Sequence, residues 1–219
     1  MNEARDTIFA RLHRALTREC IDPATRERLD RRLASPSRGP QPALSNDGTA
    51  QFIAKADAAA STVARADSPE AVVRIVQDYL TAHGLAPSLV TAPASELASL
   101  AWPEDIHVER RAALADDTTA LTAAFAGVAE TGSLVLLSGP RTPTSLNFLP
   151  ENYVCLLSQS RIVSHTEDVW SLLREEYEGL PRALNFITGP SRTADVEQTI
   201  QLGAHGPRRV LIILIDDWD

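Results

Sequence analysis

The stretch RVLIILI, residues 209–215, places six apolar residues in a row after its arginine. Two further runs, GSLVLLS (132–138) and ALNFIT (183–188), also lack a strict alternation of polar and apolar residues. Strands that are covered on only one face alternate, whereas strands covered on both faces do not. We therefore expect these three runs to be strands of a sheet that is covered on both faces.

Helical segments stand between the expected strands. SPEAVVRIVQDYLTAHG (68–84) has a serine N-cap, a proline at the first helical position and a terminal glycine. A second helix is expected over HTEDVWSLLREEYEG (165–179), and short strands over PSLVTA (87–92) and YVCLLS (153–158). This alternation predicts an α/β three-layer sandwich with a mainly parallel central sheet. The segment TALTAAFAGVAETG fits either a helix or a strand.

The N-terminal part has a different composition. ARDTIFARLHRALT (4–17) spaces its apolar residues as an amphipathic helix does, and a second charged segment follows. Residues 34–48, ASPSRGPQPALSNDG, have the proline, serine and glycine content of a linker. We expect an N-terminal helical arm and linker over 1–47 and one α/β domain over 48–219.

The charge of the chain is unevenly distributed. The whole sequence carries a net charge of −8, which argues against general binding to nucleic acid or to anionic lipid. Residues 1–40 contain nine arginines and six acidic residues, so this segment is positive and the remainder carries −11. The segment is either a solvated helix face or an arm that docks on an acidic surface.

Cysteine and lysine usage excludes several chemistries. Cys20 and Cys155 lie far apart without a CxxC motif, so neither a disulfide framework nor a zinc site is expected. Two cysteines cannot supply the usual four thiolates of an iron-sulfur cluster. Lys55 is the only lysine, and the chain has neither a P-loop nor a GxGxxG motif after a strand.

Features of exported or membrane proteins are not expected either. The first residues mix charged with apolar side chains, unlike the hydrophobic region of a signal peptide. No run approaches the ~20 apolar residues of a membrane span. We expect a cytoplasmic protein without a bound metal or cofactor of its own.

The first candidate site is ITGPSRTADVE, residues 187–197. A strand that ends at Thr188 and a helix that begins near Arg192 would leave amide N–H groups pointing at an anion. Arg192 could then grip a carboxylate or phosphate, with hydroxyls from Ser191 and Thr193. Ordinary capping by Ser191, with Asp195 and Glu197 complementing the helix dipole, explains the same pattern without a ligand.

The same reasoning separates His205 from this turn. GAHGP (203–207) would end the helix, which would place His205 ~15 Å from Ser191 along the helix axis. We therefore expect no nucleophilic triad of Ser191, His205 and Asp195.

The second candidate site is GVAETGSLVLLSGPRTP, residues 127–143. Glu130 precedes Thr131 and Gly132 at the start of an expected strand, where its carboxylate could act as a base or a nucleophile. A solvated turn is the alternative. Arg141 and Asn147 in the following loop are additional candidate contacts.

Together, GVAETGSLVLL, LPENYVCLL, RIV and ITGPSRTADVEQTIQLGAHGPRRVLIIL resemble the LUD-domain family, in its lactate-utilisation protein C branch, over roughly residues 50–215. The resemblance implies a fold similar to that of the sugar-isomerase and CoA-transferase group. It also implies a cytoplasmic three-component system that oxidises L-lactate to pyruvate, in which two partner proteins carry iron-sulfur clusters.

The resemblance marks the following positions: Glu130, Thr131, Gly132, Gly189, Pro190, Ser191, Thr193, Asp195, Glu197, His205, Gly206 and Pro207. Ser133 stands where many family members carry threonine, which keeps the hydroxyl. The leading hypothesis is an accessory subunit that binds a small carboxylate or phosphate, or a partner, around Glu130 and residues 189–195. The alternative is an autonomous small-molecule enzyme of CoA-transferase, isomerase or cyclo-ligase type that uses Glu130.

Overall fold

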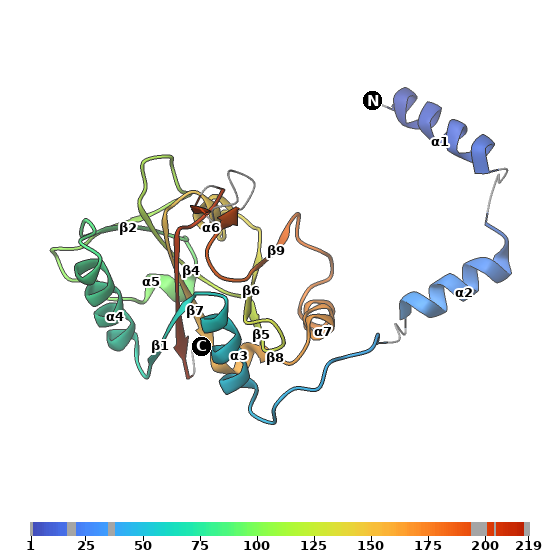
Figure 1. The fold of residues 1–219 in the computed structure, drawn as a ribbon. Coiled ribbons are helices and arrows are strands. Elements are labelled where there is room, and N and C mark those ends of the chain that lie inside the picture. The colour runs from blue at the N-terminus through green and yellow to red at the C-terminus, as the bar shows by residue number, and fades with distance from the viewer. Residues whose placement is uncertain (1, 17–20, 35–37, 194–200, 204, 217–219) are drawn as a thin grey trace. The chain divides into compact units, whose positions relative to one another are not determined.

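The structure, a computed structural model, describes residues 2–16, 21–34, 38–193, 201–203 and 205–216 (Figure 1). The chain divides into two compact units, residues 1–41 and 42–219. The arm and linker expected from the sequence end at Asp47, which is the N-cap of helix α3 (Gly48–Ala58). Its carboxylate accepts a 2.9 Å hydrogen bond from the amide of Ala50.

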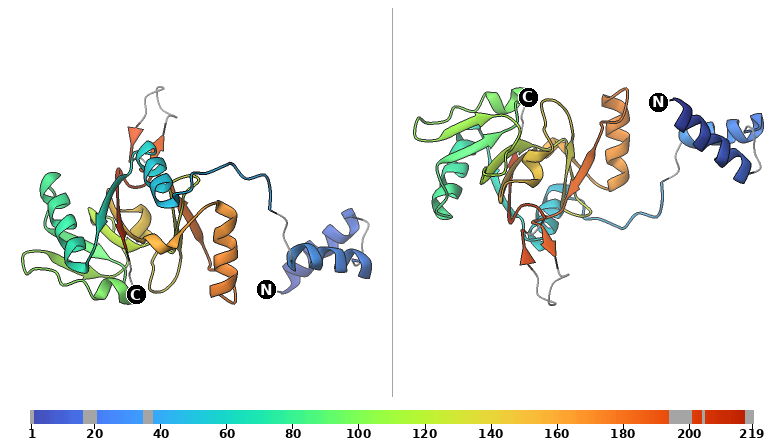
Figure 2. Two further views of the ribbon diagram at one scale, coloured as in Figure 1. Left: turned by 90° about the horizontal axis from the view of Figure 1, so that it is seen from below. Right: turned by 90° about the horizontal axis from the view of Figure 1, so that it is seen from above.

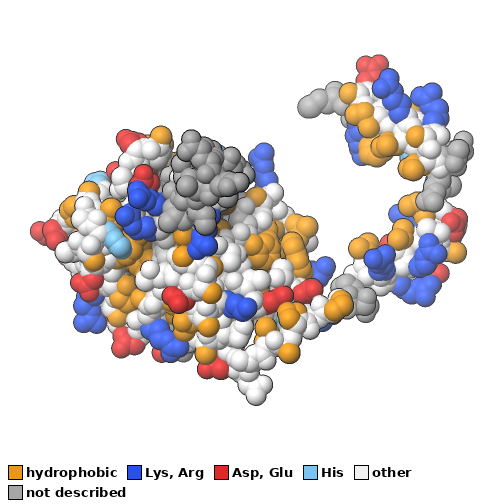
Figure 3. Space-filling view, in the orientation of Figure 1, with side chains coloured by type: hydrophobic (Ala, Val, Ile, Leu, Met, Phe, Trp, Pro, Cys, Tyr) orange, Lys and Arg blue, Asp and Glu red, His pale blue; other side chains and the backbone are white. Residues whose placement is uncertain are grey.

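The first unit contains two helices: α1 (Asn2–Leu16), at the amphipathic helix that the sequence predicts, and α2 (Pro23–Ala34), at the second charged segment. The apolar side chains of α1 are exposed, with Phe9 at 47% and Leu16 at 61%, and α2 buries no residue. Hydrophobic and basic side chains lie side by side on the surface of both helices (Figure 3).

The second unit is built on a six-stranded sheet in the order β1-β12-β7-β4-β2-β3. All five strand pairs in it are parallel. The strands are β1 (Thr62–Ala66), β2 (Ser88–Thr91), β3 (His107–Arg110), β4 (Thr119–Ala123), β7 (Asn152–Ser158) and β12 (Arg209–Ile215). The predicted α/β class and mainly parallel central sheet are therefore confirmed, and the ambiguous segment 119–128 forms strands.

A second sheet has the order β8-β5-β6-β9. Its strands are β5 (Ala126–Val128), β6 (Ser133–Leu137), β8 (Ile162–Val163) and β9 (Leu184–Ile187). The runs 132–138 and 183–188 were expected in the sheet of RVLIILI. That placement is wrong, because they form β6 and β9 of this second sheet, where they pair antiparallel. Strand β6 is buried on both faces, as the inner strands of the parallel sheet are, so its composition alone does not show to which sheet it belongs.

Helices α4 (Pro69–Ala82) and α7 (Thr166–Glu176) are the long helices after α3. Shorter turns form α5 (Ser95–Ala98), α6 (Ser145–Phe148) and the 3-10 helix η1 (Gln159–Arg161). Ser68 caps α4 as predicted, because its hydroxyl accepts a hydrogen bond from Ala71. His165 is the N-cap residue of α7, and its amide donates a 2.9 Å hydrogen bond to the carboxylate of Asp168.

The layers follow from the side chains of β6. Leu134 and Leu136 belong to the core shared with the six-stranded sheet, whereas Val135 packs with Val169 of α7. The four-stranded sheet therefore lies between the main core and α7. Helices α4 and α7 lie on opposite sides of this unit, with the sheets between them (Figure 2).

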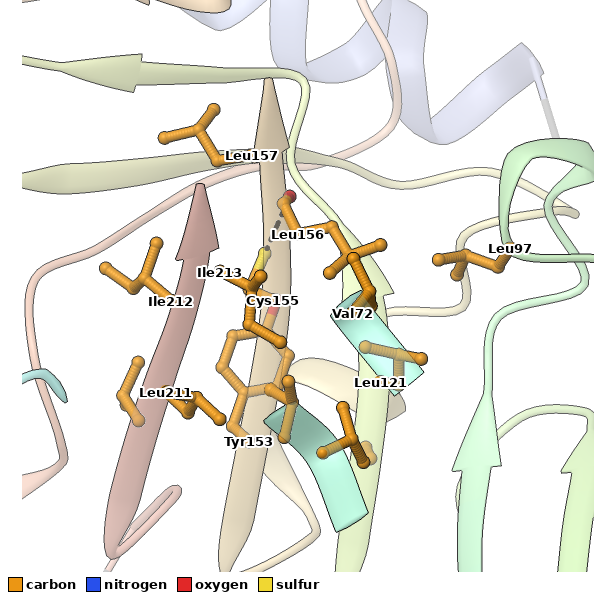
Figure 4. Packing of buried hydrophobic residues seen from close by; sticks show 14 of the residues in the cluster. Val72, Leu97, Leu121, Tyr153, Cys155, Leu156, Leu157, Leu211, Ile212 and Ile213 are labelled. Atoms are coloured by element: carbon orange, nitrogen blue, oxygen red, sulfur yellow. Dashed lines mark hydrogen bonds between the residues drawn. The ribbon is translucent and has the colours of Figure 1, made fainter. Parts of the chain in front are cut away.

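The centre of the core lies on β7 and β12. Tyr153 and Cys155 point from β7 toward the buried side chains of Ile213 and Leu121 (Figure 4). Burial of each aliphatic side chain of this size contributes about 1.5–3 kcal/mol. The Tyr153 hydroxyl is satisfied by that of Thr122 at 2.6 Å. Within the described residues, no helix has the length and apolar character of a membrane span.

Candidate functional site

The Glu130 turn connects β5 to β6 next to the start of α7. The amide of Glu130 donates a 3.0 Å hydrogen bond to the carbonyl of Ser164, which fixes the backbone. Its side chain is half-buried, and no described residue donates a hydrogen bond to its carboxylate. Gly132 follows with φ of +70°, and a Cβ there would lie 2.3 Å from the amide nitrogen of Ala56. Only glycine permits this approach of the turn to α3.

Three hydroxyls form a chain beside this turn. The Ser133 hydroxyl lies 2.6 Å from that of Thr131 and 2.6 Å from that of Thr188. The antiparallel pairing of Leu134 with Ile187 brings Ser133 and Thr188 to the same end of β6 and β9. Ser133 is buried, whereas Thr131 and Thr188 are exposed, so the chain offers hydroxyls to the surface at both ends.

The Gly189 turn also contacts α3. Gly189 has φ of +72°, and a Cβ there would lie 2.0 Å from the carbonyl oxygen of Ala59. A side chain at this position is excluded by both the backbone conformation and the overlap. The C-terminal half of α3 therefore holds two of the predicted site segments together.

The predicted helix after Gly189 is wrong at both of its described ends. Arg192–Thr193 form strand β10, which pairs antiparallel with β11 (Gln201–Leu202). Asp195 and Glu197, which were predicted to complement a helix dipole, lie outside the described residues. The local sequence pattern fits a helix start. Contacts with residues distant in sequence instead fix Ser191 in a non-helical segment before β10.

These contacts join Ser191 to the GAHGP segment. The amide of Ser191 donates to the carbonyl of Pro207 at 2.8 Å, and its carbonyl accepts from the amide of Gly203 at 2.9 Å. A Cβ on Gly206 would lie 3.3 Å from that of Ser191. The predicted separation of Ser191 from the histidine turn by a helix length is therefore wrong. His205 is exposed on this turn.

Arg192 also differs from its predicted geometry. Its Nη2 donates a 3.0 Å hydrogen bond to the carbonyl of Ala59, the C-cap residue of α3. A cation is favoured at the C-terminal end of a helix, where carbonyl groups lack partners. The Ser191 amide and one N–H of Arg192 are already bonded within the protein, and no helix begins at Arg192. The predicted anion site at a helix N-terminus is therefore not formed. The assignment of anion binding to Gly189, Ser191, Arg192 and Thr193 stays a prediction.

A cavity of about 1040 Å³ lies elsewhere, beyond the carboxyl ends of β4, β7 and β12. Ala123, Ser158 and Ile215 from these strand ends contribute to its lining. The predicted site segments lie at the other edge, since Pro207 and Ser191 meet just before β12 begins at Arg209. Of the residues named from the sequence, Arg141 lines the cavity, whereas Glu130 does not.

Comparison with known families decides the relationship. The LUD domain model matches residues 43–215 of this chain. The chain belongs to the LUD domain family. The match begins one residue after the start of the second compact unit (42–219) and ends at Ile215, the last residue of β12. The family resemblance of the sequence is therefore confirmed.

Several of the curated proteins that are similar to this LUD domain protein are named lactate utilization protein C. A lactate utilization protein C from Anoxybacillus flavithermus is 33% identical over 65% of this chain and 69% of its own length. One from Geobacillus sp. is 36% identical over 41% of this chain and 39% of its own length. An uncharacterized protein from Neisseria meningitidis is 30% identical over 64% of this chain and 60% of its own length.

One solved structure shares the fold. The crystal structure of a DUF162 family protein from Deinococcus radiodurans matches with a TM-score of 0.58 and 18% identity. The match covers 80% of this LUD domain protein and 99% of that chain. The kinship with the sugar-isomerase and CoA-transferase group stays a prediction.

Sequence reasoning missed most of the cavity lining. Arg161 and Glu176 both line it and form a bidentate ion pair, and Arg161 lies over the ring of Phe125 at 4.6 Å. These residues are far apart in sequence and carry no shared motif. Only the expected parallel sheet could have indicated them, because ligands bind beyond the carboxyl ends of parallel strands.

Proposed function

We propose that this LUD domain protein is an accessory component of an iron-sulfur-dependent system that oxidises L-lactate to pyruvate. Membership of the LUD domain family and similarity to proteins named lactate utilization protein C support a role in lactate utilisation. The partners in this proposal are two iron-sulfur lactate-utilisation proteins, and the system acts in the cytoplasm.

The cysteines support placing the clusters in the partner proteins. The chain has two cysteines, and Cys155 is fully buried in the core. Burial raises the pKa of the Cys155 thiol from 9.0 to about 11, so it stays protonated near neutral pH. The ligands of an iron-sulfur cluster are thiolates, usually four of them. In this proposal the chain therefore binds and positions, while electrons pass through the partners.

The observation that carries the binding role is the convergence of three family-marked segments. The Glu130 and Gly189 turns pack on α3, and the His205 turn is joined to Ser191 by backbone hydrogen bonds. Their positions are fixed by glycines that admit no side chain. Exposed hydroxyl, guanidinium and imidazole groups gather there, from Thr131, Thr188, Arg192 and His205. We name this surface the motif surface.

The motif surface suits an acidic partner segment or a small carboxylate or phosphate. Arg192 uses one N–H on Ala59, and the guanidinium has five N–H donors in all. Its remaining donors and the neighbouring hydroxyls can bond an anion without a helix N-terminus. In this proposal, side-chain donors therefore bind the anion, in place of the amides of a helix N-terminus.

The alternative function is an autonomous enzyme that uses Glu130. The half-buried carboxylate without a described hydrogen-bond donor favours this alternative, because such a group is available as a base or nucleophile. It lies at the edge of the motif surface, next to the Thr131 hydroxyl chain. Only the enzyme alternative needs the Glu130 carboxylate, so a substitution there distinguishes the two functions.

Anaerobic purification of the tagged chain from its native cells tests the proposal. We expect iron-containing proteins and L-lactate oxidation to co-purify with it, and Arg192→Ala to lower both, whereas Arg110→Ala on the exposed edge strand β3 lowers neither. Glu130→Gln should leave both intact. If Glu130→Gln abolishes oxidation while the iron proteins still co-purify, Glu130 is catalytic. A chain that purifies without iron proteins contradicts the subunit role.

A further inference from the structure

The cavity at the carboxyl ends of the strands lies where the strand order of the six-stranded sheet reverses, between β2 and β4. From β2 the chain continues outward to the edge strand β3, whereas β4, on the other side of β2, leads on to β7 and β12. Ala94 and Ser95, which follow β2, and Ala124, which follows β4, all line the cavity. In open parallel sheets, ligands bind at such a point, because the diverging loops leave a crevice between them.

One wall of the cavity is aromatic and apolar. Tyr177 packs against the ring of Phe125 with centroids 5.9 Å apart, and Arg161 covers Phe125 at 4.6 Å. Arg161 also donates a 2.8 Å hydrogen bond to the Phe125 carbonyl and pairs with Glu176, so its charge is neutralised. Tyr177 and Leu180 are 47% and 74% exposed. Large exposed apolar side chains on a concave wall suit a flat ring.

The loop after β6 carries a cation of different character. Arg141 lies in a turn closed by backbone hydrogen bonds between Gly139 and Thr142, and the Thr142 hydroxyl donates to the carbonyl of Leu137. Its partner among the described residues is the neutral hydroxyl of Ser95, at 3.4 Å. Ser95 in turn donates a 3.1 Å hydrogen bond to the carboxylate of Glu96, which also lines the cavity. No described carboxylate forms an ion pair with Arg141 itself, whereas Glu176 pairs with Arg161. Ser95 and Arg141 both line the cavity.

We propose that this cavity binds a nucleotide, with its phosphate on Arg141 and its ring against Tyr177 and Leu180. An anion site and an apolar wall in one cavity match a ligand that joins a phosphate to a ring. The volume of about 1040 Å³ is at the upper end for small-molecule sites and far exceeds the need of a small acid such as lactate. Adenine and flavin nucleotides share this chemistry.

Calorimetric titration of the purified full chain tests the site. The probes are ADP and FMN, each compared with its phosphate-free counterpart, adenosine or riboflavin, and with inorganic phosphate. We expect saturable one-to-one binding of ADP or FMN that is tighter than that of the matching nucleoside. Arg141→Gln should raise the Kd of the bound nucleotide about tenfold and leave the nucleoside unchanged. Leu180→Ser should weaken both.

Arg110→Gln is the matched control, since Arg110 lies on β3 and does not line the cavity. Thermal melting of each variant shows whether it is folded. Preference for ADP or for FMN identifies the class of nucleotide. Absence of saturable binding of both up to about 1 mM, or a nucleotide Kd that Arg141→Gln leaves unchanged, overturns the proposal. The titration needs neither lactate nor partners, so its failure is separate from that of the proposed function.

Discussion

The guanidinium of Arg192 donates a 3.0 Å hydrogen bond to the carbonyl of Ala59, across 133 residues of sequence. This contact joins β10 to the last turn of α3, at the same carbonyl that Gly189 approaches without a side chain. Arg192, which the sequence pattern predicts to bind an anion, thus also caps the C-terminal end of helix α3. Its two roles are separable by experiment.

Arg192→Ala should lower the free energy of unfolding by about 1 kcal/mol, because the Ala59 carbonyl loses its charged donor. Urea denaturation of the full chain measures this change. Arg110→Ala, on the exposed strand β3, is the control and should change stability by less than ~0.5 kcal/mol. Equal stability of the Arg192→Ala variant and the natural chain would contradict the capping role.

Gly189→Ala should destabilise the protein strongly. The new Cβ would lie 2.0 Å from the Ala59 carbonyl in a backbone with positive φ, so we expect a loss of about 2–4 kcal/mol. Gly84→Ala separates the two causes, because Gly84 has φ of +61° and open space around it; we expect about 1 kcal/mol there. Gly179→Ala, also in open space, should be nearly neutral. Similar losses of unfolding free energy for Gly189→Ala and Gly84→Ala would show that Gly189 does not pack closely on α3.

The Asp117 carboxylate should make stability depend on acid pH. Hydrogen bonds from Arg111, at 2.6 and 2.9 Å, lower the pKa of Asp117 below its ordinary 3.8, and the Leu114 amide adds a further bond. A carboxyl with a lowered pKa stabilises the folded state above the unfolded pKa and loses that contribution as the pH falls through the folded pKa.

Asp117→Asn should therefore cost about 1–2 kcal/mol at pH 7 and progressively less below pH 3.8. Urea denaturation at several pH values measures the difference. Asp116→Asn is the control, since Asp116 is exposed beside it. A cost for Asp117→Asn that does not shrink in acid would mean that the pair with Arg111 is not formed.

Cys155 should be unreactive in the folded protein. It is fully buried and burial raises the pKa of its thiol to about 11, so little thiolate meets solvent at pH 8. In a Cys20→Ser variant, a disulfide reagent such as DTNB should titrate no thiol until denaturant is added, and then one. Rapid reaction in the native state would contradict the placement of Cys155 in the core.

Much of the fold could be predicted from short sequence patterns. The serine and proline that start α4, and the apolar run of β12, act through neighbouring residues and were interpreted correctly. Strands β1 and β3 were missed because they form the two edges of the sheet and expose much of their length, so neither is an apolar run. The division of strands between two sheets depends on long-range pairing, which a single sequence does not specify.

The candidate site divides in the same way. Gly132 and Gly189 were named from the motif, and the structure supplies their physical reason in the backbone of α3. The helix after Ser191 was wrong because hydrogen bonds to Pro207 and Gly203 override local propensity. The cavity around Arg141 gathers residues from several strand ends, so only the assembled sheet defines it.

The central claim, that this LUD domain protein is needed for L-lactate oxidation by partner proteins, is tested most directly in extracts. The rate of L-lactate-dependent reduction of a dye is measured in extract of cells from which the gene is deleted, before and after addition of the purified chain. We predict a rate near background that the natural chain restores and the Arg192→Ala variant restores poorly. A deletion extract that oxidises L-lactate at the full rate would contradict the account.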